Sequence, residues 1–274
     1  MWALGVVITV LAAVGAGQLL VRSKSGEPSD SIWDIPRTTA TYTSIVGMLA
    51  GFTVVVTMFF ANLTVARSSP QFEAVIGMLL LGFLLFISTA MMFGTTPNLA
   101  TTDDDDYVRL QTVSYQLANL CYFCAIATSW LSLKLFLDAI GLPFAANAFK
   151  WVLLFTSFAG AMRMALFTLK ASTLPRVACV AVPFLGLGFA ALFRLVVVPQ
   201  VPALDLGDAE PFRIAICLFV VGAVGFSWQT AIIMSEDKAR TATFLRARGD
   251  RLLLAFLQAV ATTISMLWLA VATK

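Results

Sequence analysis

The chain has 274 residues, of which 59% are hydrophobic and 12% charged, and its mean hydropathy is +0.90. This is more apolar surface than a soluble core of that size can bury. The net charge of +3 is small, and histidine is absent, which excludes His-ligated haem and zinc sites, Ser-His hydrolysis and histidine proton relays. The composition predicts a multispan membrane protein.

Eight apolar runs are long enough to cross a hydrocarbon core of about 30 Å, which takes about 20 helical residues. The runs are continuous rather than alternating, and the bilayer offers backbone groups no hydrogen bonds, so the runs indicate helices. We therefore expect an all-α integral membrane protein, a single multispan helical bundle over residues 1–274, with spans at residues 2–21, 39–66, 72–93, 108–137, 149–169, 177–198, 212–234 and 252–272.

The first run, residues 2–21, has no basic residue before it, whereas Arg22 and Lys24 follow it. This order indicates a retained helix with its amino end outside rather than a secretory signal. Connections then alternate between the two sides of the membrane, and most cations gather on one side, which the positive-inside tendency makes cytoplasmic. We expect an inner (plasma) membrane protein whose cytoplasmic cations are Arg22, Lys24, Arg37, Arg109, Lys170, Arg176, Lys238, Arg240, Arg246, Arg248 and Arg251.

The second run has a polar start and one side made of small residues, which include Thr43, Gly47, Ala50 and Gly51. Lipid gives helices little hydrophobic reason to associate, so close backbone approach across small residues and threonine hydrogen bonds supply the attraction. We predict that this side contacts another helix, either in the same chain or in a second copy.

The start of this run, TATYTSIVGMLAGF at residues 39–52, resembles a helix of small bacterial multispan proteins. These proteins include ion-channel-like effectors of anti-phage systems such as the Hailong type. The resemblance covers one predicted helix of eight, and its Gly-x-x-x-Gly-Phe motif has low specificity. It implies a homo-oligomeric, tetrameric effector that short single-stranded DNA from a partner nucleotidyltransferase holds inactive, and that permeabilises the membrane once released. No functional residue is transferred by it.

Four consecutive carboxylates, Asp103, Asp104, Asp105 and Asp106, connect the third and fourth runs on the predicted cytosolic side. Such a group is typical of a solvated loop. If copies of the chain surround an axis, the same residues form a ring that concentrates cations at a pore mouth. The negative sign then predicts a preference for cations.

The fourth run is the most polar of the eight, and Thr112, Gln116 and Asn119 recur along one helical face. Amides in hydrocarbon need partners, which come either from a neighbouring helix or from water in a passage. These three residues are therefore candidates for lining a pore, with a structural hydrogen-bonding role as the alternative.

The same run contains Cys121 and Cys124 in the CxxC spacing of thiol exchange. The pair lies deep in the span, and Cys179 and Cys217 are isolated in other runs, so packing as small apolar residues is the favoured interpretation. Paired carboxylates near the membrane midplane and a phosphate-binding Gly-rich loop are both absent from the sequence. We expect no catalytic constellation, no cofactor and no metal site.

Two arginines, Arg163 and Arg194, lie inside the fifth and sixth runs, where each either snorkels to an interface or faces a polar cavity or an anionic ligand. The connection at residues 235–250 is basic and cytosolic. Anionic lipid or a polyanion such as a short oligonucleotide would bind a cationic face formed by Lys170, Arg176, Lys238, Arg240, Arg246, Arg248 and Arg251.

Three functions fit these patterns. A gated, cation-preferring, homo-oligomeric pore is favoured by the acidic connection and the polar fourth run. A small-molecule or lipid transporter should show broken spans in repeated halves, and Pro183 supplies one break without a clear twin. A membrane scaffold or CxxC redox protein is the third reading.

Overall fold

The structure is a computed structural model that describes residues 35–63, 71–99, 105–149, 151–152 and 210–235. Within these ranges the assigned elements are the helices α2 (Ile35–Asn62), α4 (Phe72–Thr95), η2 (Thr96–Leu99), α5 (Asp105–Ala139) and α8 (Glu210–Ile233). Four of them contain stretches long and apolar enough to cross a membrane: Thr38–Asn62, Phe72–Thr95, Val113–Ala139 and Pro211–Ile233.

These four helices confirm the prediction of an all-helical membrane protein and match four of the predicted runs. The runs at 2–21, 177–198 and 252–272 lie outside the described residues, as does nearly all of the run at 149–169. One predicted boundary is wrong. Asp105 and Asp106 form the first turn of α5 instead of belonging to a loop, where negative charge is favoured by the positive end of the helix dipole.

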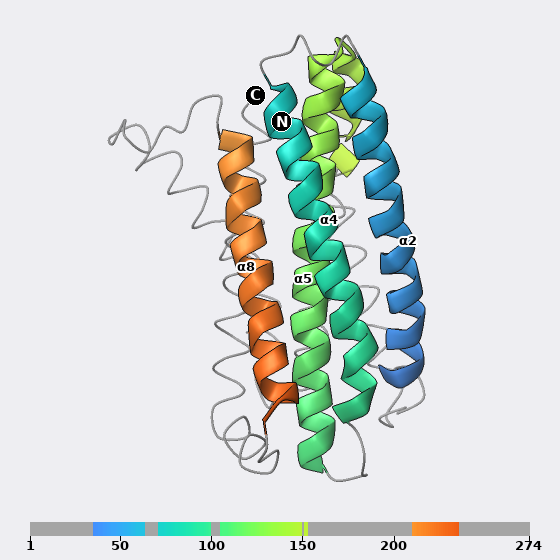
Figure 1. The fold of residues 1–274 in the computed structure, drawn as a ribbon, viewed down its shortest axis with the longest axis vertical. Coiled ribbons are helices and arrows are strands. Elements are labelled where there is room, and N and C mark those ends of the chain that lie inside the picture. The colour runs from blue at the N-terminus through green and yellow to red at the C-terminus, as the bar shows by residue number, and fades with distance from the viewer. Residues whose placement is uncertain (1–34, 64–70, 100–104, 150, 153–209, 236–274) are drawn as a thin grey trace, which may run out of the picture.

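Contacts between side chains give the direction of each helix. Ser132 of α5 donates to the carbonyl oxygen of Val75 near the start of α4, at 3.0 Å. At the other end of these helices, the hydroxyls of Thr96 and Ser114 lie 3.2 Å apart. The helices α4 and α5 are therefore antiparallel neighbours (Figure 1).

The helices α8 and α2 continue this alternation. Phe212 at the start of α8 packs beside Gly77 near the start of α4, so α8 runs parallel to α4. The ring of Tyr42 near the start of α2 stacks on that of Phe93 near the end of α4, with centroids 5.2 Å apart. Thus α2 and α5 run one way while α4 and α8 run the other (Figure 1).

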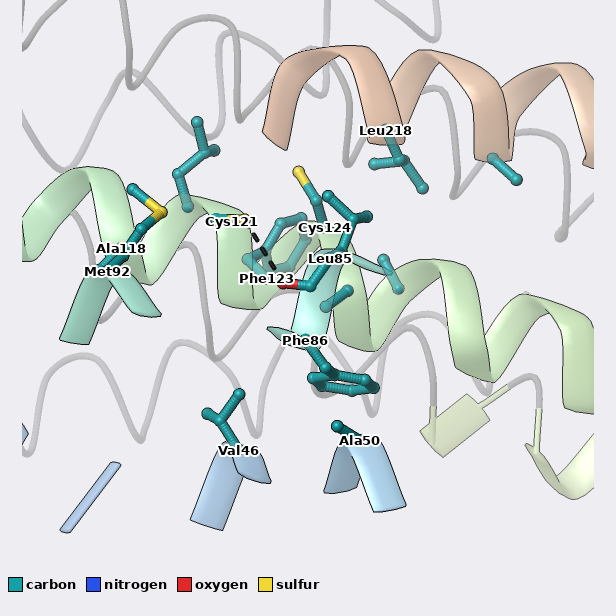
Figure 2. Packing of buried hydrophobic residues seen from close by; sticks show 14 of the residues in the cluster. Val46, Ala50, Leu85, Phe86, Met92, Ala118, Cys121, Phe123, Cys124 and Leu218 are labelled. Atoms are coloured by element: carbon teal, nitrogen blue, oxygen red, sulfur yellow. Dashed lines mark hydrogen bonds between the residues drawn. The ribbon is translucent and has the colours of Figure 1, made fainter. Parts of the chain in front are cut away.

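The helix α5 occupies the centre of the described bundle. Buried residues make up 61% of its most apolar stretch, against 22% for α2 at the periphery. In Figure 2, Ala50 of α2 lies beside the ring of Phe86 of α4, and Leu218 of α8 approaches the core from the opposite side. Moving an apolar group from lipid into a protein changes its free energy little. Helices in lipid are therefore stabilised mainly by close van der Waals packing of this kind.

Two glycines permit the closest approaches around this core. A Cβ atom at Gly82 of α4 would overlap Oγ of Ser129 on α5. A Cβ at Gly222 of α8 would lie 2.5 Å from a methyl of Leu85 and 3.6 Å from Sγ of Cys121. These glycines, rather than those of α2, set how closely the described helices pack.

Candidate functional site: a polar half of the bundle

Buried polarity is distributed unevenly along the bundle. We define the polar half as residues 35–49, 84–99, 105–122 and 222–235, where α2 and α5 begin and α4 and α8 end, at the bottom of Figure 1. All the buried side-chain amides of the described residues lie in this half: Gln111, Gln116, Asn119 and Gln229. The other half includes stacked rings of Phe60 and Phe136, with centroids 3.5 Å apart.

A hydrogen-bonded cluster in the polar half joins four elements, α4, η2, α5 and α8. Gln229 of α8 is 1% exposed, and its Nε2 donates to the carbonyl oxygen of Met92 and to Oγ1 of Thr96, both at 3.0 Å. The same nitrogen also contacts Oγ of Ser114 on α5. The hydroxyl of Thr96 in turn donates to the Met92 carbonyl at 2.8 Å. We call Gln229, Thr96 and Ser114 the Gln229 cluster.

Sequence reasoning missed the Gln229 cluster. Gln229 is the single amide in the apolar run 212–234, which is the signal that could have identified it. Its partners lie 115 to 137 residues away in the chain, so the sequence could not name them.

The two amides that the sequence suggested as pore lining, Gln116 and Asn119, are both buried, with exposed fractions of 1% and 7%. Asn119 Nδ2 donates to the carbonyl oxygen of Tyr115, one turn earlier in α5, at 2.9 Å. In contrast, neither Nε2 nor Oε1 of Gln116 has a hydrogen-bond partner among the described residues. A buried amide left unpaired is unusual in a native protein and points to a bound water, ion or ligand.

The helical positions show which side of α5 these amides occupy. Ser114, Cys121 and Ser132 contact α4, and Gln116 lies two residues, or about 200°, from Ser114 around the helix. Gln116 and Asn119 therefore lie on the side of α5 away from α4. Because both are buried, the candidate site is inside the protomer rather than on its outer surface.

The other predicted site residues are only partly described. Thr112 lies within α5, as do Asp105 and Asp106 in its first turn. Asp103 and Asp104 lie outside the described residues, as do Arg163, Arg194 and the predicted anion-binding cations Lys170, Arg176, Lys238, Arg240, Arg246, Arg248 and Arg251.

The residues on the small side of α2 have different environments in the structure, some buried and some exposed. Ala50 is buried and contributes to the core, and Thr43 donates to the carbonyl oxygen of Thr39 at 2.8 Å. Gly47 and Gly51 are exposed, and a Cβ built on either glycine meets no described atom within 4 Å. The helix instead buries a neighbouring stripe with seven-residue spacing, formed by Thr39, Val46, Thr53 and Phe60. Contact of the two glycines with a second copy stays a prediction.

The two cysteines of α5 take part in packing. Both are buried and free, and Cys121 Sγ lies 3.6 Å from the carbonyl oxygen of Leu85, as Figure 2 shows. Both also line the space occupied by Gly222 of α8. These contacts support the packing interpretation over thiol exchange. The described ranges contain no group of three or more acidic, cysteine or histidine residues that could hold a metal ion.

Comparison with protein-family models, curated proteins and solved structures finds no match for this chain.

Proposed function

We propose that the protein is a gated, cation-preferring membrane pore that assembles as a homo-oligomer and depolarises the membrane when it opens. The observation that carries this proposal is the amide of Gln116, which is 1% exposed and whose two polar atoms have no partner in the part of the chain that the structure describes. An unpaired buried polar group costs about 1–3 kcal/mol. An ion or water moving through the protomer would bond this amide and offset that cost.

The charge distribution along α5 supports a preference for cations. The helix begins at Asp105, within the acidic stretch of residues 103–106, and Gln116 follows about three turns later. A group of negative charges beside a low-dielectric passage raises the local concentration of cations and accelerates their entry.

Neutralising the acidic stretch should therefore reduce conductance without abolishing it. We expect replacement of Asp103, Asp104, Asp105 and Asp106 by asparagine to reduce cation conductance most at low ionic strength, because salt screens surface charges. Recordings in planar bilayers at about 20 mM and 500 mM KCl would measure the difference. An equal reduction at both concentrations would contradict the electrostatic role.

Gln116→Leu tests directly whether the buried amide of Gln116 takes part in ion passage. We expect at least a tenfold loss of monovalent-cation flux into proteoliposomes, because leucine cannot bond an ion. Removing an unpaired buried amide should leave thermal stability unchanged or raise it. A structural hydrogen-bonding role predicts the opposite, namely lower stability with flux retained.

The matched control is Thr128→Val, which also removes a buried hydrogen-bonding group from α5. The Thr128 hydroxyl has no hydrogen-bond partner in the structure, and it lies outside the polar half. Valine has nearly the same shape, so flux and stability should both resemble those of the unchanged protein. A comparable loss of flux in this variant would show that the effect at Gln116 is not local.

A transporter of a small polar solute is the second candidate, favoured by the burial of Gln116 and Asn119 inside one protomer. A carrier encloses its substrate within the protein instead of between copies. Proteoliposomes that exchange a labelled solute but pass no ionic current would establish this alternative.

Assembly and regulation belong to the same proposal. A tetramer, an anti-phage role and a short single-stranded DNA ligand are what the resemblance of residues 39–52 implies, and the basic residues of 238–251 would bind such a polyanion or anionic lipid. Neutralising Arg246, Arg248 and Arg251 should weaken oligonucleotide binding and reduce its dependence on salt. An unchanged salt slope would place the ligand elsewhere.

The exposed glycines of α2 offer a test of assembly. Gly51→Leu should reduce the oligomer mass in mild detergent while leaving the protomer folded, because close backbone approach between copies would be lost. The effect should amount to several tenths to a few kcal/mol per contact, measured by particle mass against protein concentration. An unchanged protein that is a monodisperse monomer in detergent and in bilayers would contradict the homo-oligomeric part of the proposal.

A further inference from the structure

The chemistry of the polar half bears on which ions the pore would select. We propose that Gln116 and Asn119 form an interior site for a partly dehydrated monovalent cation, and that this site discriminates against divalent cations. The inference rests on the proposed pore function and names the class of ion that the pore conducts.

The geometry of Asn119 fixes the direction of its amide. Its Nδ2 is held by the Tyr115 carbonyl oxygen at 2.9 Å, so the carbonyl end of the side chain is turned away from that backbone group. Gln116 lies one turn earlier on the adjoining part of the same helical face.

The available ligand atoms are neutral oxygens. Oε1 of Gln116 is buried and accepts no hydrogen bond from any described residue. Together with the amide oxygen of Asn119, it offers two uncharged acceptors on one face of α5. Rings of neutral carbonyl oxygens are what replaces the hydration shell of a monovalent cation in selective channels.

Carboxylates are missing where a divalent cation would need them. Proteins bind Ca²⁺ largely through Asp and Glu oxygens, and Mg²⁺ gives up its waters reluctantly. Every predicted span lacks an acidic residue except at its ends, where Glu73 lies and where Asp138 follows the fourth span. Both are exposed in the structure, and Asp138 is paired with Lys134 at 2.6 Å.

The acidic residues at the start of α5 are too far away to supply that charge. Asp106 precedes Gln116 by ten residues, which corresponds to about 15 Å along a helix. Oxygens that coordinate Ca²⁺ lie about 2.3–2.6 Å from it, so Asp106 cannot coordinate an ion held by Gln116. The acidic stretch therefore attracts cations of either valence, while the neutral amides decide which of them enters.

The decisive experiment uses the full chain in proteoliposomes and compares K⁺ and Na⁺ flux with Ca²⁺ and Mg²⁺ flux. The unchanged protein should pass monovalent cations at least tenfold faster. Gln116→Glu keeps the size of the side chain and adds a carboxylate, so it should raise the Ca²⁺-to-K⁺ flux ratio or make micromolar Ca²⁺ block K⁺ flux. Measurements at pH 7 and pH 9 ensure that the new carboxyl is ionised in at least one condition.

Gln71→Glu is the matched control, because it makes the same change just before α4, outside the polar half. Its flux ratio should stay that of the unchanged protein. Equal passage of Ca²⁺ and K⁺ by the unchanged protein would overturn the inference. So would a Gln116→Glu variant with unaltered Ca²⁺ sensitivity at both pH values.

A binding measurement separates failure of the inference from failure of the proposed function. At equal ionic strength, KCl or NaCl should raise the thermal midpoint relative to choline chloride, since an ion that binds only the folded state stabilises it. Gln116→Leu should lose this difference. If no ion crosses the membrane, but KCl or NaCl raises the thermal midpoint and Gln116→Leu abolishes this rise, the cation site is supported and the pore function is contradicted. If monovalent ions cross the membrane but KCl and NaCl do not raise the thermal midpoint of the unchanged protein, the pore function is supported and the cation site is contradicted.

Discussion

Replacing Gly82 by leucine is expected to destabilise the bundle by about 3 kcal/mol, which is the upper part of the usual range for overpacking. A Cβ at this position overlaps Oγ of Ser129 and lies 3.5 Å from the backbone nitrogen of the same residue. The hydroxyl can rotate away, but the backbone of α5 can yield only if the whole helix moves. The thermal midpoint in detergent should fall by on the order of 10 °C.

Gly47→Leu is the control for this substitution. It makes the same change in another membrane-crossing helix, where a new Cβ meets no described atom within 4 Å. Leucine also favours helix over glycine by nearly 1 kcal/mol, so the protomer should be at least as stable as before. If Gly47→Leu lowered the thermal midpoint of the dissociated protomer as much as Gly82→Leu does, Gly47 would have to face the bundle instead of its surroundings.

Replacing Gln229 by leucine should cost about 1–3 kcal/mol, the range for removing a partner from a buried hydrogen-bonded group. The substitution removes the donor to Met92 and Thr96 and the contact with Ser114. The substitution thereby removes the contacts of Gln229 that join α8 to α4, η2 and α5. The thermal midpoint should fall, and amide hydrogen exchange at the ends of α4 and α8 should become faster.

Ser227→Ala provides the comparison for Gln229. Ser227 lies half a turn earlier in α8, is exposed, and donates to the carbonyl oxygen of Ala223 in its own helix at 2.9 Å. Its loss should change stability by no more than about 0.5 kcal/mol. A Gln229→Leu protein as stable as Ser227→Ala would show that the cluster does not hold α8 in place.

The predicted spans were accurate where the signal is local. The run at 72–93 became α4, Phe72–Thr95, because the length of apolar chain needed to cross a bilayer is a property of each segment alone. The fourth run extended by three residues to Asp105, since acidic residues are favoured in the first turn of a helix as well as in a loop.

The sequence did not show which side of α2 packs against the other helices of the chain. Small residues permit close contact, and Ala50 did enter the core, but Gly47 and Gly51 face outward from the described bundle. Apolar side chains are stable against lipid and against protein alike, so the sequence alone does not distinguish the two environments.

The sequence by itself determined that this is a helical membrane protein without histidine chemistry, and that α5 carries an unusual number of amides. Only the tertiary structure decided that Gln116 is buried without a partner, while Gln229 and Ser114 meet across 115 residues of chain. The reason is physical. Span length and composition act within a segment, whereas the satisfaction of a polar group depends on which helices lie beside it, and that depends on the packing of the whole bundle.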